Sequence, residues 1–203
     1  MKPLLPLLLL AAASLPVVAQ TSPKFDYYLL TLSWSPEYCH SHTSSTQCAS
    51  DKHFGFVVHG LWPEYKTGSG PQHCGNQPGL SDPGSMLDIM PDLGLVQHEW
   101  TTHGTCSGLS ADQYFGLIRK AFGGIRQPTQ LTSATKQQTL SPRQVKQAFE
   151  TANPQLNDAE MMINCASNYL QAVEICLNKS LQPISCPAPS DCRASTIRVP
   201  PVH

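Results

Sequence analysis

Eight cysteines constrain this chain of 203 residues more than any other feature of its sequence. An even number of cysteines in an exported chain indicates disulfide bonds, which form and persist in an oxidising compartment. No pair has the two-residue separation of a zinc ribbon. Eight cysteines allow on the order of 100 pairings, so the connectivity stays open at this point. The predicted disulfide cysteines are Cys39, Cys48, Cys74, Cys106, Cys165, Cys176, Cys186 and Cys192.

The first 19 residues have the organisation of a secretory signal peptide. Lys2 gives a basic start, residues 4–13 are apolar apart from one proline, and residues 17–19 supply small side chains for cleavage after Ala19. A membrane span would need ~20 unbroken apolar residues, so no membrane anchor is expected. We therefore expect a secreted or periplasmic protein in which residues 20–203 form a single domain with its own core.

The charge of the chain argues against broad nucleic-acid binding. The formal net charge is −1, there are eight histidines, and no run of basic residues is present. Proteins that bind polyanions over a wide surface usually carry a basic stripe, so any polyanion must be held locally here. Histidines become cationic below a pKa of ~6.5, so affinity for a polyanion is expected to strengthen in mild acid.

Turn residues and hydrophobic periodicity divide the chain into short strands and helices. Strands are predicted at residues 26–35, 54–61, 170–177 and 184–186. Helices are predicted at residues 97–106, where the helix ends at Gly104, and at residues 111–122 and 141–152, with Ser110 and Ser141 at the starts of the last two. Surface loops are predicted at residues 39–52 and 63–91. The mixture predicts an α+β domain.

His98, Glu99 and His103 lie close together in the sequence and suggest either a metal site or an acid–base site. A helical zinc-protease motif places its two histidines four residues apart, so that both face one metal ion. Here the histidines are five apart, which separates them by ~140° on a helix, whereas Glu99 and His103 lie ~40° apart. We therefore expect a carboxylate–imidazole pair and no metal, with the carboxylate orienting His103 and raising its pKa.

One of the predicted strands contains a histidine. Strict alternation places His59 on the same face as Val57 and Leu61, opposite Trp62. A histidine inside an apolar strand is commonly a satisfied core residue. Concerted proton transfer, however, requires two groups from separate segments, and His59 together with His103 supplies such a pair.

Two segments resemble the signatures of the ribonuclease T2 family. His-Gly-Leu-Trp-Pro at residues 59–63 is similar to the first, and His-Glu-Trp-Thr-Thr-His-Gly-Thr-Cys at residues 98–106 is similar to the second. The resemblance extends to residues 28–39 and 165–186, and so covers most of the chain after the signal peptide. It implies an α+β fold with an antiparallel sheet core and flanking helices. It also implies the disulfides Cys39–Cys48, Cys74–Cys106, Cys165–Cys192 and Cys176–Cys186.

The resemblance further implies a reaction, that of a metal-independent, cyclising RNA endonuclease of low base specificity. The 2′-hydroxyl of single-stranded RNA attacks its own phosphate, which gives a 2′,3′-cyclic phosphate and then a 3′-phosphate. DNA lacks this hydroxyl and is not cleaved. By the family pattern, His103 is the base, His59 the acid, Glu99 the group that orients or balances charge, and His98 a phosphate ligand. No cofactor is implied, and a monomer is expected.

One position departs from the family pattern. The family usually has a lysine where this chain has Thr102. Loss of one electrostatic donor typically costs ~100- to 1,000-fold in rate. Either another cation, such as Lys52 or Lys66, replaces it, or the chain is a catalytically weakened T2-like binding or inhibitory module.

The remaining aromatic residues and histidines receive simpler interpretations. Trp62 follows His59 closely and is expected to stack a base, with a core position as the alternative. Trp34 and Trp100 are expected in the core. The other histidines are expected to be solvated loop residues: His40, His42, His53 and His73.

Overall fold

The computed structural model describes residues 24–49 and 51–202, so the expected signal peptide lies outside the described residues. Within them, six strands form one sheet in the order β2-β1-β5-β6-β3, with β4 also paired to β5. Neighbouring strands are antiparallel except β5 and β6, which are parallel. The strands are β1 (Tyr27–Trp34), β2 (Phe56–Glu64), β3 (Gln138–Leu140), β4 (Met161–Ala166), β5 (Tyr169–Leu177) and β6 (Ile197–Val199). The predicted α+β class is confirmed, and the parallel pair makes the sheet mixed.

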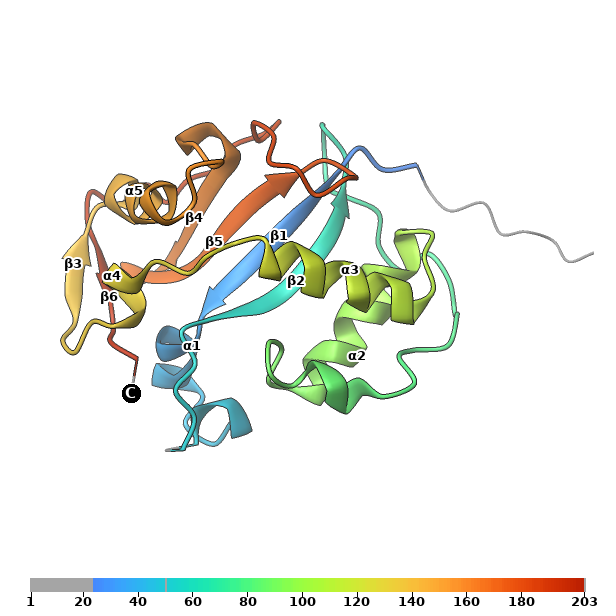
Figure 1. Cartoon of the computed structure of the whole chain (residues 1–203), viewed down its shortest axis with the longest axis horizontal. Helices are drawn as coiled ribbons and strands as arrows, with labels where there is room; N and C mark the ends of the chain where they lie inside the picture. The colour runs from blue at the N-terminus through green and yellow to red at the C-terminus, as the bar shows by residue number, and fades with distance from the viewer. Residues whose placement is uncertain (1–23, 50, 203) are drawn as a thin grey trace, which may run out of the picture.

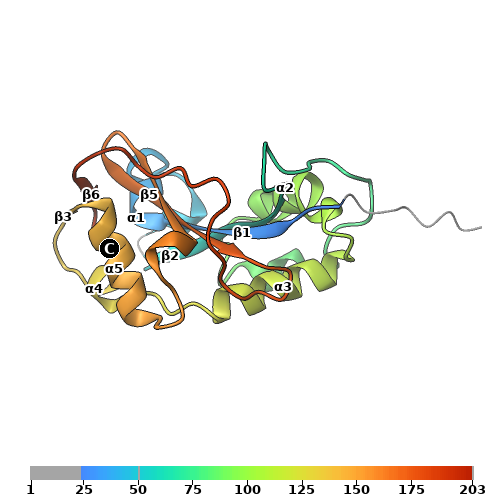
Figure 2. The ribbon, with the colours of Figure 1, turned by 90° about the horizontal axis from the view of Figure 1, so that it is seen from above.

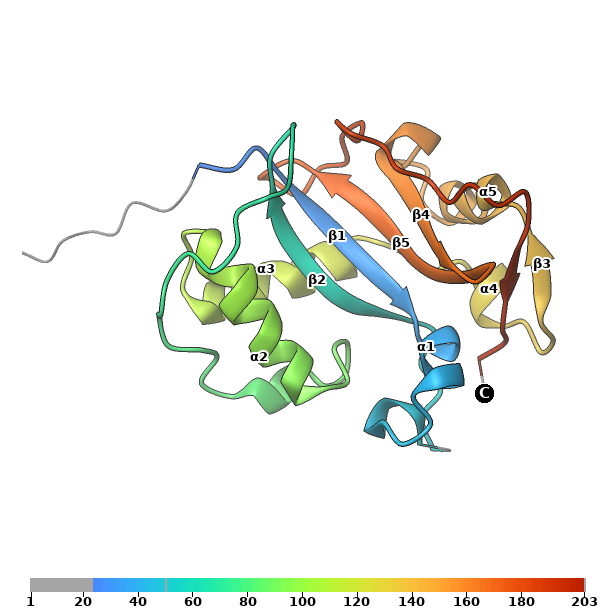
Figure 3. The same ribbon diagram turned by 180° about the vertical axis from the view of Figure 1, so that it is seen from behind.

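Helices cover one face of this sheet and border the other. Figure 1 shows α3 and α5 on the side of the strands that faces the viewer, and Figure 2 shows α1 and α2 on the opposite side. From behind, β1, β2 and β5 lie toward the viewer with α1 and α2 beside them (Figure 3). The helices are α1 (Ser35–Ser41), α2 (Leu93–Thr102), α3 (Ala111–Gly123), α4 (Thr129–Thr132) and α5 (Pro142–Ala152). Short 3₁₀ helices occupy Thr46–Cys48, Pro83–Met86, Gly104–Cys106 and Asp158–Glu160.

The main core lies between the covered face and its helices. Alternation along β1 sends Leu30, Leu32 and Trp34 into it, where each is fully buried. Phe115 of α3 and Phe149 of α5 belong to the same cluster. Since the alternate β1 residues face the other way, that second face is free to carry polar side chains.

The sequence predicts two of the main helices well and the third less well. Capping boxes at Ser110 and Ser141 start α3 and α5, as predicted. Helix α2 begins at Leu93, four residues before the predicted start, because the Asp92 side chain accepts the backbone N–H of Leu95 at 2.7 Å. It ends at Thr102, two residues before the predicted end at Gly104.

Other elements were missed or wrongly placed. Part of the predicted loop at residues 39–52 belongs to α1, which begins with a proline in its first turn. Residues 184–186 are not a strand, and this segment makes isolated contacts such as Ile184 N–H to Cys176 O at 2.9 Å. The strands β3, β4 and β6 were not predicted, because β3 and β6 are only three residues long and β4 contains Asn164 and Cys165.

The eight cysteines form four disulfides. Their pairs are the four that the family resemblance implies: Cys39–Cys48, Cys74–Cys106, Cys165–Cys192 and Cys176–Cys186. The Cys74–Cys106 bond ties the long loop before α2 to the segment that follows α2. Among the described residues, no helix is long and apolar enough to cross a bilayer.

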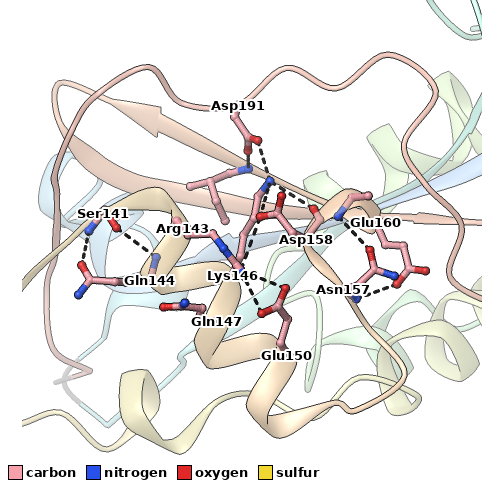
Figure 4. Close-up of polar contacts among 12 residues, drawn as sticks. Ser141, Arg143, Gln144, Lys146, Gln147, Glu150, Asn157, Asp158, Glu160 and Asp191 are labelled. Atoms are coloured by element: carbon pink, nitrogen blue, oxygen red, sulfur yellow. Dashed lines mark hydrogen bonds and ion pairs between the residues drawn. The ribbon is translucent and has the colours of Figure 1, made fainter.

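A buried lysine anchors the chain near the third disulfide (Figure 4). Lys146 of α5 is 4% exposed, and its Nζ lies 2.6 Å from Oδ2 of Asp191. The other oxygen of Asp191 accepts the backbone N–H of Ile163 in β4 at 2.8 Å. Asp191 precedes Cys192, so this network fixes the C-terminal segment against α5 and the sheet.

Candidate active site

His59 occupies a β-bulge. Thr31 is opposite Gly60 and Leu32 is opposite Val58, so His59 is the extra residue on β2. Strict alternation predicted that His59 and Leu61 share a face, and this is wrong. The bulge shifts the phase, so Leu61 joins the main core while His59 borders hollows on the open face.

The alternative of a core histidine at this position is also wrong. The His59 side chain is 43% exposed. Its Nδ1 lies 3.3 Å from the Ser33 hydroxyl of β1, which fixes the ring orientation. Its Nε2 lies 3.7 Å from Oε1 of Glu99. One ring nitrogen is therefore held by the sheet, and the other lies beside the carboxyl group of α2.

Glu99 is fully buried at the centre of the site. Its Oε2 accepts the indole N–H of Trp62 at 2.7 Å, whereas its Oε1 has no hydrogen-bond partner among the described residues. A Cβ on Gly60 would overlap both Glu99 Oε2 and the Trp62 indole, so the glycine after His59 is required by this close approach.

His103 lies just beyond the end of α2. Its backbone (φ −114°, ψ −45°) departs from the helix, and its N–H still bonds to Glu99 O at 3.1 Å. The ring stacks on Trp62, with centroids 5.1 Å apart and planes 25° apart. It also approaches His98 edge-on, at 6.4 Å between centroids. The indole of Trp62 thus contacts both proposed catalytic histidines, since it also makes a T-shaped contact with His59 at 5.4 Å between ring centroids.

The electrostatics of the site differ from the expectation. Burial and the neighbouring histidines His98, His59 and His73 lower the pKa of His103 to about 4. Burial, with His98, also lowers the pKa of His59. Burial raises the pKa of Glu99 to about 8, against a smaller lowering by the Trp62 hydrogen bond. The prediction that Glu99 raises the His103 pKa is therefore wrong: a carboxyl that stays neutral in mild acid cannot stabilise an imidazolium.

The expected separation of His98 from His103 is also wrong. Ligand atoms of His98, Glu99 and His103 all lie within 4.8 Å of one another, because the chain leaves the helix before His103. The ~140° argument assumed an unbroken helix. These three residues are the group of described side chains that could hold a divalent ion, with His98 exposed and the other two buried.

Two hollows meet at His59. One, of about 290 Å³, is bordered by Trp62, the start of α1 and residues of β1, β4 and β5. The other, of about 180 Å³, lies between α1 and α2 and includes Tyr38 and Leu95 in its wall. Both provide space for groups of a bound ligand next to the histidine.

The cation proposed to replace the missing family lysine is not in these hollows. Thr102 is buried and its hydroxyl has no hydrogen-bond partner among the described residues. Lys52 pairs with Asp51 at 3.4 Å and borders a hollow beside the Cys39–Cys48 disulfide. Lys66 is exposed, and its backbone N–H bonds to Asp26. Neither lysine borders a hollow that contains His59.

Sequence reasoning missed His73. It is exposed, as predicted for a loop residue, but its backbone N–H bonds to Thr102 O at 2.8 Å, and its charge lowers the pKa of His103. The signal was the disulfide pair: Cys74 follows His73, and its implied partner Cys106 lies three residues after His103. Trp34 and Trp100 are buried in the core, as predicted, and His40, His42 and His53 are exposed.

Comparisons with known proteins agree with the motifs. The model of the ribonuclease T2 family matches residues 25–186. A probable ribonuclease of Haemophilus influenzae is 33% identical over 178 residues, covering 79% of this chain and 61% of that protein. A ribonuclease of Aeromonas hydrophila is 32% identical over 164 residues, covering 77% of this chain and 73% of that protein. The chain thus spans less than two thirds of the Haemophilus relative.

Solved structures share the fold at lower identity. An RNase-related protein from Calystegia sepium superposes with a TM-score of 0.71 at 23% identity, over 88% of this chain and 98% of that one. RNase NT in complex with 5′-AMP gives a TM-score of 0.70 at 23% identity, over 88% of this chain and 99% of that one. At this identity, the likeness carries the fold alone.

Proposed function

Because the chain belongs to the ribonuclease T2 family, we propose that it is a secreted or periplasmic endonuclease that cleaves single-stranded RNA through the RNA's own 2′-hydroxyl. The observation that carries this proposal is the meeting of His59, from a bulge in β2, with Glu99 and His103, from the end of α2, around one tryptophan. Two imidazoles from separate segments beside a carboxyl group are what concerted proton transfer needs.

In the first step, His103 acts as the base. Its low pKa keeps the ring neutral in mild acid, so it can accept the proton of the 2′-hydroxyl. The 2′-oxygen then bonds to phosphorus and the bond to the 5′-oxygen breaks. His59, protonated, gives its proton to that leaving oxygen. The products are a 2′,3′-cyclic phosphate and a free 5′-hydroxyl.

In the second step, the roles reverse. His59 takes a proton from water, the water oxygen bonds to phosphorus, and the 2′-oxygen leaves with a proton from His103. This opens the cycle to a 3′-phosphate. DNA offers no 2′-hydroxyl and therefore cannot enter the first step.

Glu99 acts as a buried positioning group. Its pKa of about 8 keeps it protonated in mild acid, and Trp62 already occupies Oε2. The proton is thus on Oε1, the atom without a partner, 3.7 Å from His59 Nε2. Because the Glu99 side chain is fully buried, this neutral acid orients Trp62 and His59 and does not itself contact the phosphate. His98, which is exposed beside His103, binds the phosphate.

His73 supplies part of the charge that the family lysine would provide. Its backbone N–H bonds to Thr102 O, which brings it beside the position of that lysine, and its charge contributes to the lowered pKa of His103. The alternative, a catalytically weakened binding module, is motivated by the same Thr102.

Product analysis tests the proposal. Oxidised protein is incubated in EDTA with a short RNA and with the same oligonucleotide carrying one 2′-deoxy position at the cleavage site. We expect a cyclic phosphate on RNA by mass spectrometry, no cleavage at the 2′-deoxy position, and loss of cleavage in His59→Ala. Binding of RNA without any product would instead favour the weakened module. Cleavage that needs a divalent ion would overturn the metal-independent mechanism.

A further inference from the structure

Three segments that are far apart in the sequence meet at one end of the open face of the sheet. They are the end of α1, the start of β5 and the strand β6, and their side chains there are His40, Tyr169 and Arg198. Figure 3 shows α1, the turn between β4 and β5, and β6 together at this end of the sheet. The proposed mechanism uses none of these three residues.

A tight turn and an irregularity in the strand pairing place Tyr169 on the open face. Ser167 and Asn168 have φ of 49° and 63°, the left-handed conformation that a two-residue hairpin turn between β4 and β5 uses. The register of β4 with β5 then shifts by one residue. As a result, Leu170 enters the main core, whereas Tyr169 shares the open face with Ala172, which lines the larger hollow beside His59.

Arg198 lies against Tyr169 in a defined orientation. Its guanidinium carbon is 4.4 Å from the centroid of the ring, and its Nη1 donates to the Tyr169 hydroxyl at 3.1 Å. Among residues 24–49 and 51–202, no carboxylate forms an ion pair with this exposed arginine. A guanidinium has five N–H donors in a planar fork that matches phosphate oxygens. The bond to Tyr169 therefore orients the fork and leaves most of its donors available to an anion.

Histidines of α1 add positive charge beside this arginine. The exposed ring of His40 lies 5.7 Å from the Tyr169 ring, measured between centroids. An exposed histidine gains positive charge in mild acid. The opposing group on α1 is Glu37, whose pKa burial raises and His42 and His40 lower to a lesser extent. Its negative charge is therefore reduced in mild acid, and the end of the open face becomes more positive.

These side chains are too far from His59 to act on the reacting phosphate. The hydroxyl of Ser33 orients His59, and Ser33 pairs with Ala172 of β5. Tyr169 precedes Ala172 by three residues, which corresponds to about 10 Å of strand. A phosphate bound by Arg198 is therefore a different phosphate from the one that is cleaved.

We propose that Arg198, held on Tyr169 and assisted by His40, binds a second phosphate of the RNA strand, outside the dinucleotide that is cleaved. The proposal rests on the proposed ribonuclease function. The chain has a formal net charge of −1 and no basic stripe, so an oriented cation at the end of the open face contributes affinity where few other groups can. Longer strands should therefore be better substrates than a dinucleotide.

The test compares substrates that have the same scissile bond and different lengths. A dinucleotide with one ribonucleotide is extended on its 5′ side or its 3′ side by one to four deoxynucleotides, which carry phosphates but cannot be cleaved. We measure kcat/KM at pH 5 and low salt. Extension on one side should raise kcat/KM by roughly tenfold, and an uncharged methylphosphonate at a single position should cancel this gain.

Variants identify the residue that binds the phosphate. In Arg198→Gln, the gain from extension should fall to within about twofold, whereas the dinucleotide, which does not reach Arg198, should be cut at the wild-type rate. For the extended substrate, the slope of log kcat/KM against log salt should become shallower by about 0.7, the value for one phosphate of a single strand. The methylphosphonate should have no further effect in this variant.

Two more variants serve as a second test and as a control. Tyr169→Leu removes the ring that holds the guanidinium and should lose most of the gain while the dinucleotide is still cut. Arg126→Gln replaces an exposed arginine in the segment between α3 and α4, which crosses the covered face of the sheet (Figure 1). This matched control should keep the whole gain.

The outcomes separate this proposal from the function on which it rests. If extension gives no gain on either side while the dinucleotide is cut, the second phosphate site is wrong and the ribonuclease function stands. A gain that persists in both Arg198→Gln and Tyr169→Leu would also overturn the site. So would equal losses on the dinucleotide and on the extended substrates in both variants, since these would show a structural role. If the wild-type protein cuts none of the substrates, the ribonuclease function itself fails.

Discussion

Trp62 donates its indole N–H to Oε2 of Glu99 at 2.7 Å, and this bond joins the two signature segments of the chain. The strand β2 and the helix α2 are separated by a long loop, so their side chains could face each other in many ways. The bond fixes one arrangement, in which the indole stacks on His103 and makes a T-shaped contact with His59. Trp62 therefore positions the proposed catalytic groups, and what remains exposed of it lines the larger hollow.

Replacement of Gly60 by alanine should strongly reduce the proposed ribonuclease activity. A Cβ at this position overlaps Glu99 Oε2 and the indole of Trp62, so both side chains must move. A displacement of about 1 Å in an active site costs ~100-fold in rate, which kcat on RNA would measure. Gly116→Ala in α3 is the matched control, because a Cβ there meets nothing within 4 Å. Equal kcat in Gly60→Ala and wild type would contradict the account.

Glu99→Gln should change how the stability of the protein depends on pH. The folded-state pKa of Glu99 is about 8 and its ordinary value is 4.5, so the folded protein holds this proton more tightly than the unfolded chain. The corresponding stability is present below pH ~4.5 and is lost as the pH rises toward ~8. Glutamine cannot ionise and avoids this loss.

Urea unfolding at pH 4 and pH 8 measures this effect. The free energy of unfolding of Glu99→Gln, relative to wild type, should rise by about 4 kcal/mol between these pH values. His98→Gln, beside the same site but exposed, serves as a control. A relative stability of Glu99→Gln that is the same at both pH values would show that folding does not raise the pKa of Glu99.

The sequence predicted which residues come together better than it predicted their geometry. The residue types at 59, 99 and 103 predict an acid–base site, and the structure brings these three side chains together around Trp62. The bulge at His59 depends on the register between β1 and β2, which periodicity along one strand does not reveal. The end of α2 at Thr102 and the approach of His73 both depend on tertiary contacts, including the Cys74–Cys106 disulfide.

The fold and the pKa values were also predicted only where local sequence signals determine them. Capping residues predicted α3 and α5 because their signals are local. The three-residue strands β3 and β6 pair with each other, and β6 also pairs with β5. These strands depend on that pairing, so no local sequence pattern predicts them. The predicted direction of the His103 pKa shift was wrong. Burial, which the sequence does not show, lowers this pKa, and the neighbouring Glu99 is itself neutral and so does not raise it.

His73→Asn should shift the acidic limb of the pH–rate profile upward. The charge of His73 lowers the pKa of His103, so its removal lets His103 keep its proton to a higher pH and delays its action as a base. Asparagine tolerates the φ of 53° at this position, so the backbone should be retained. His53→Asn, another exposed histidine, should leave the profile unchanged. An acidic limb at the wild-type pH in His73→Asn would remove His73 from the site.

Because Lys146 is buried, substitutions at the two ends of its ion pair with Asp191 should differ in their effect on stability. Asp191→Ala leaves the ammonium of Lys146 without its 2.6 Å partner and the Ile163 N–H unbonded, which should cost about 2 kcal/mol in urea unfolding. Lys146→Met removes the charge together with its need for a partner and should cost less. Glu150→Gln, which breaks a half-exposed pair with Arg143, should cost under ~1 kcal/mol. Equal losses of unfolding free energy in Asp191→Ala and Glu150→Gln would refute this ranking.

The roles of His59 and His103 are tested most directly by changing the leaving group of the substrate. Uridine 3′-(4-nitrophenyl phosphate) releases an anion that needs no proton, so it bypasses the acid but still needs the base. We predict that His59→Ala loses ~100- to 10,000-fold in kcat/KM on RNA but stays within about tenfold of wild type on the nitrophenyl substrate. His103→Ala should lose ~100-fold or more on both. Equal losses by His59→Ala on both substrates, with His103→Ala spared on the nitrophenyl ester, would contradict the assignment of acid and base.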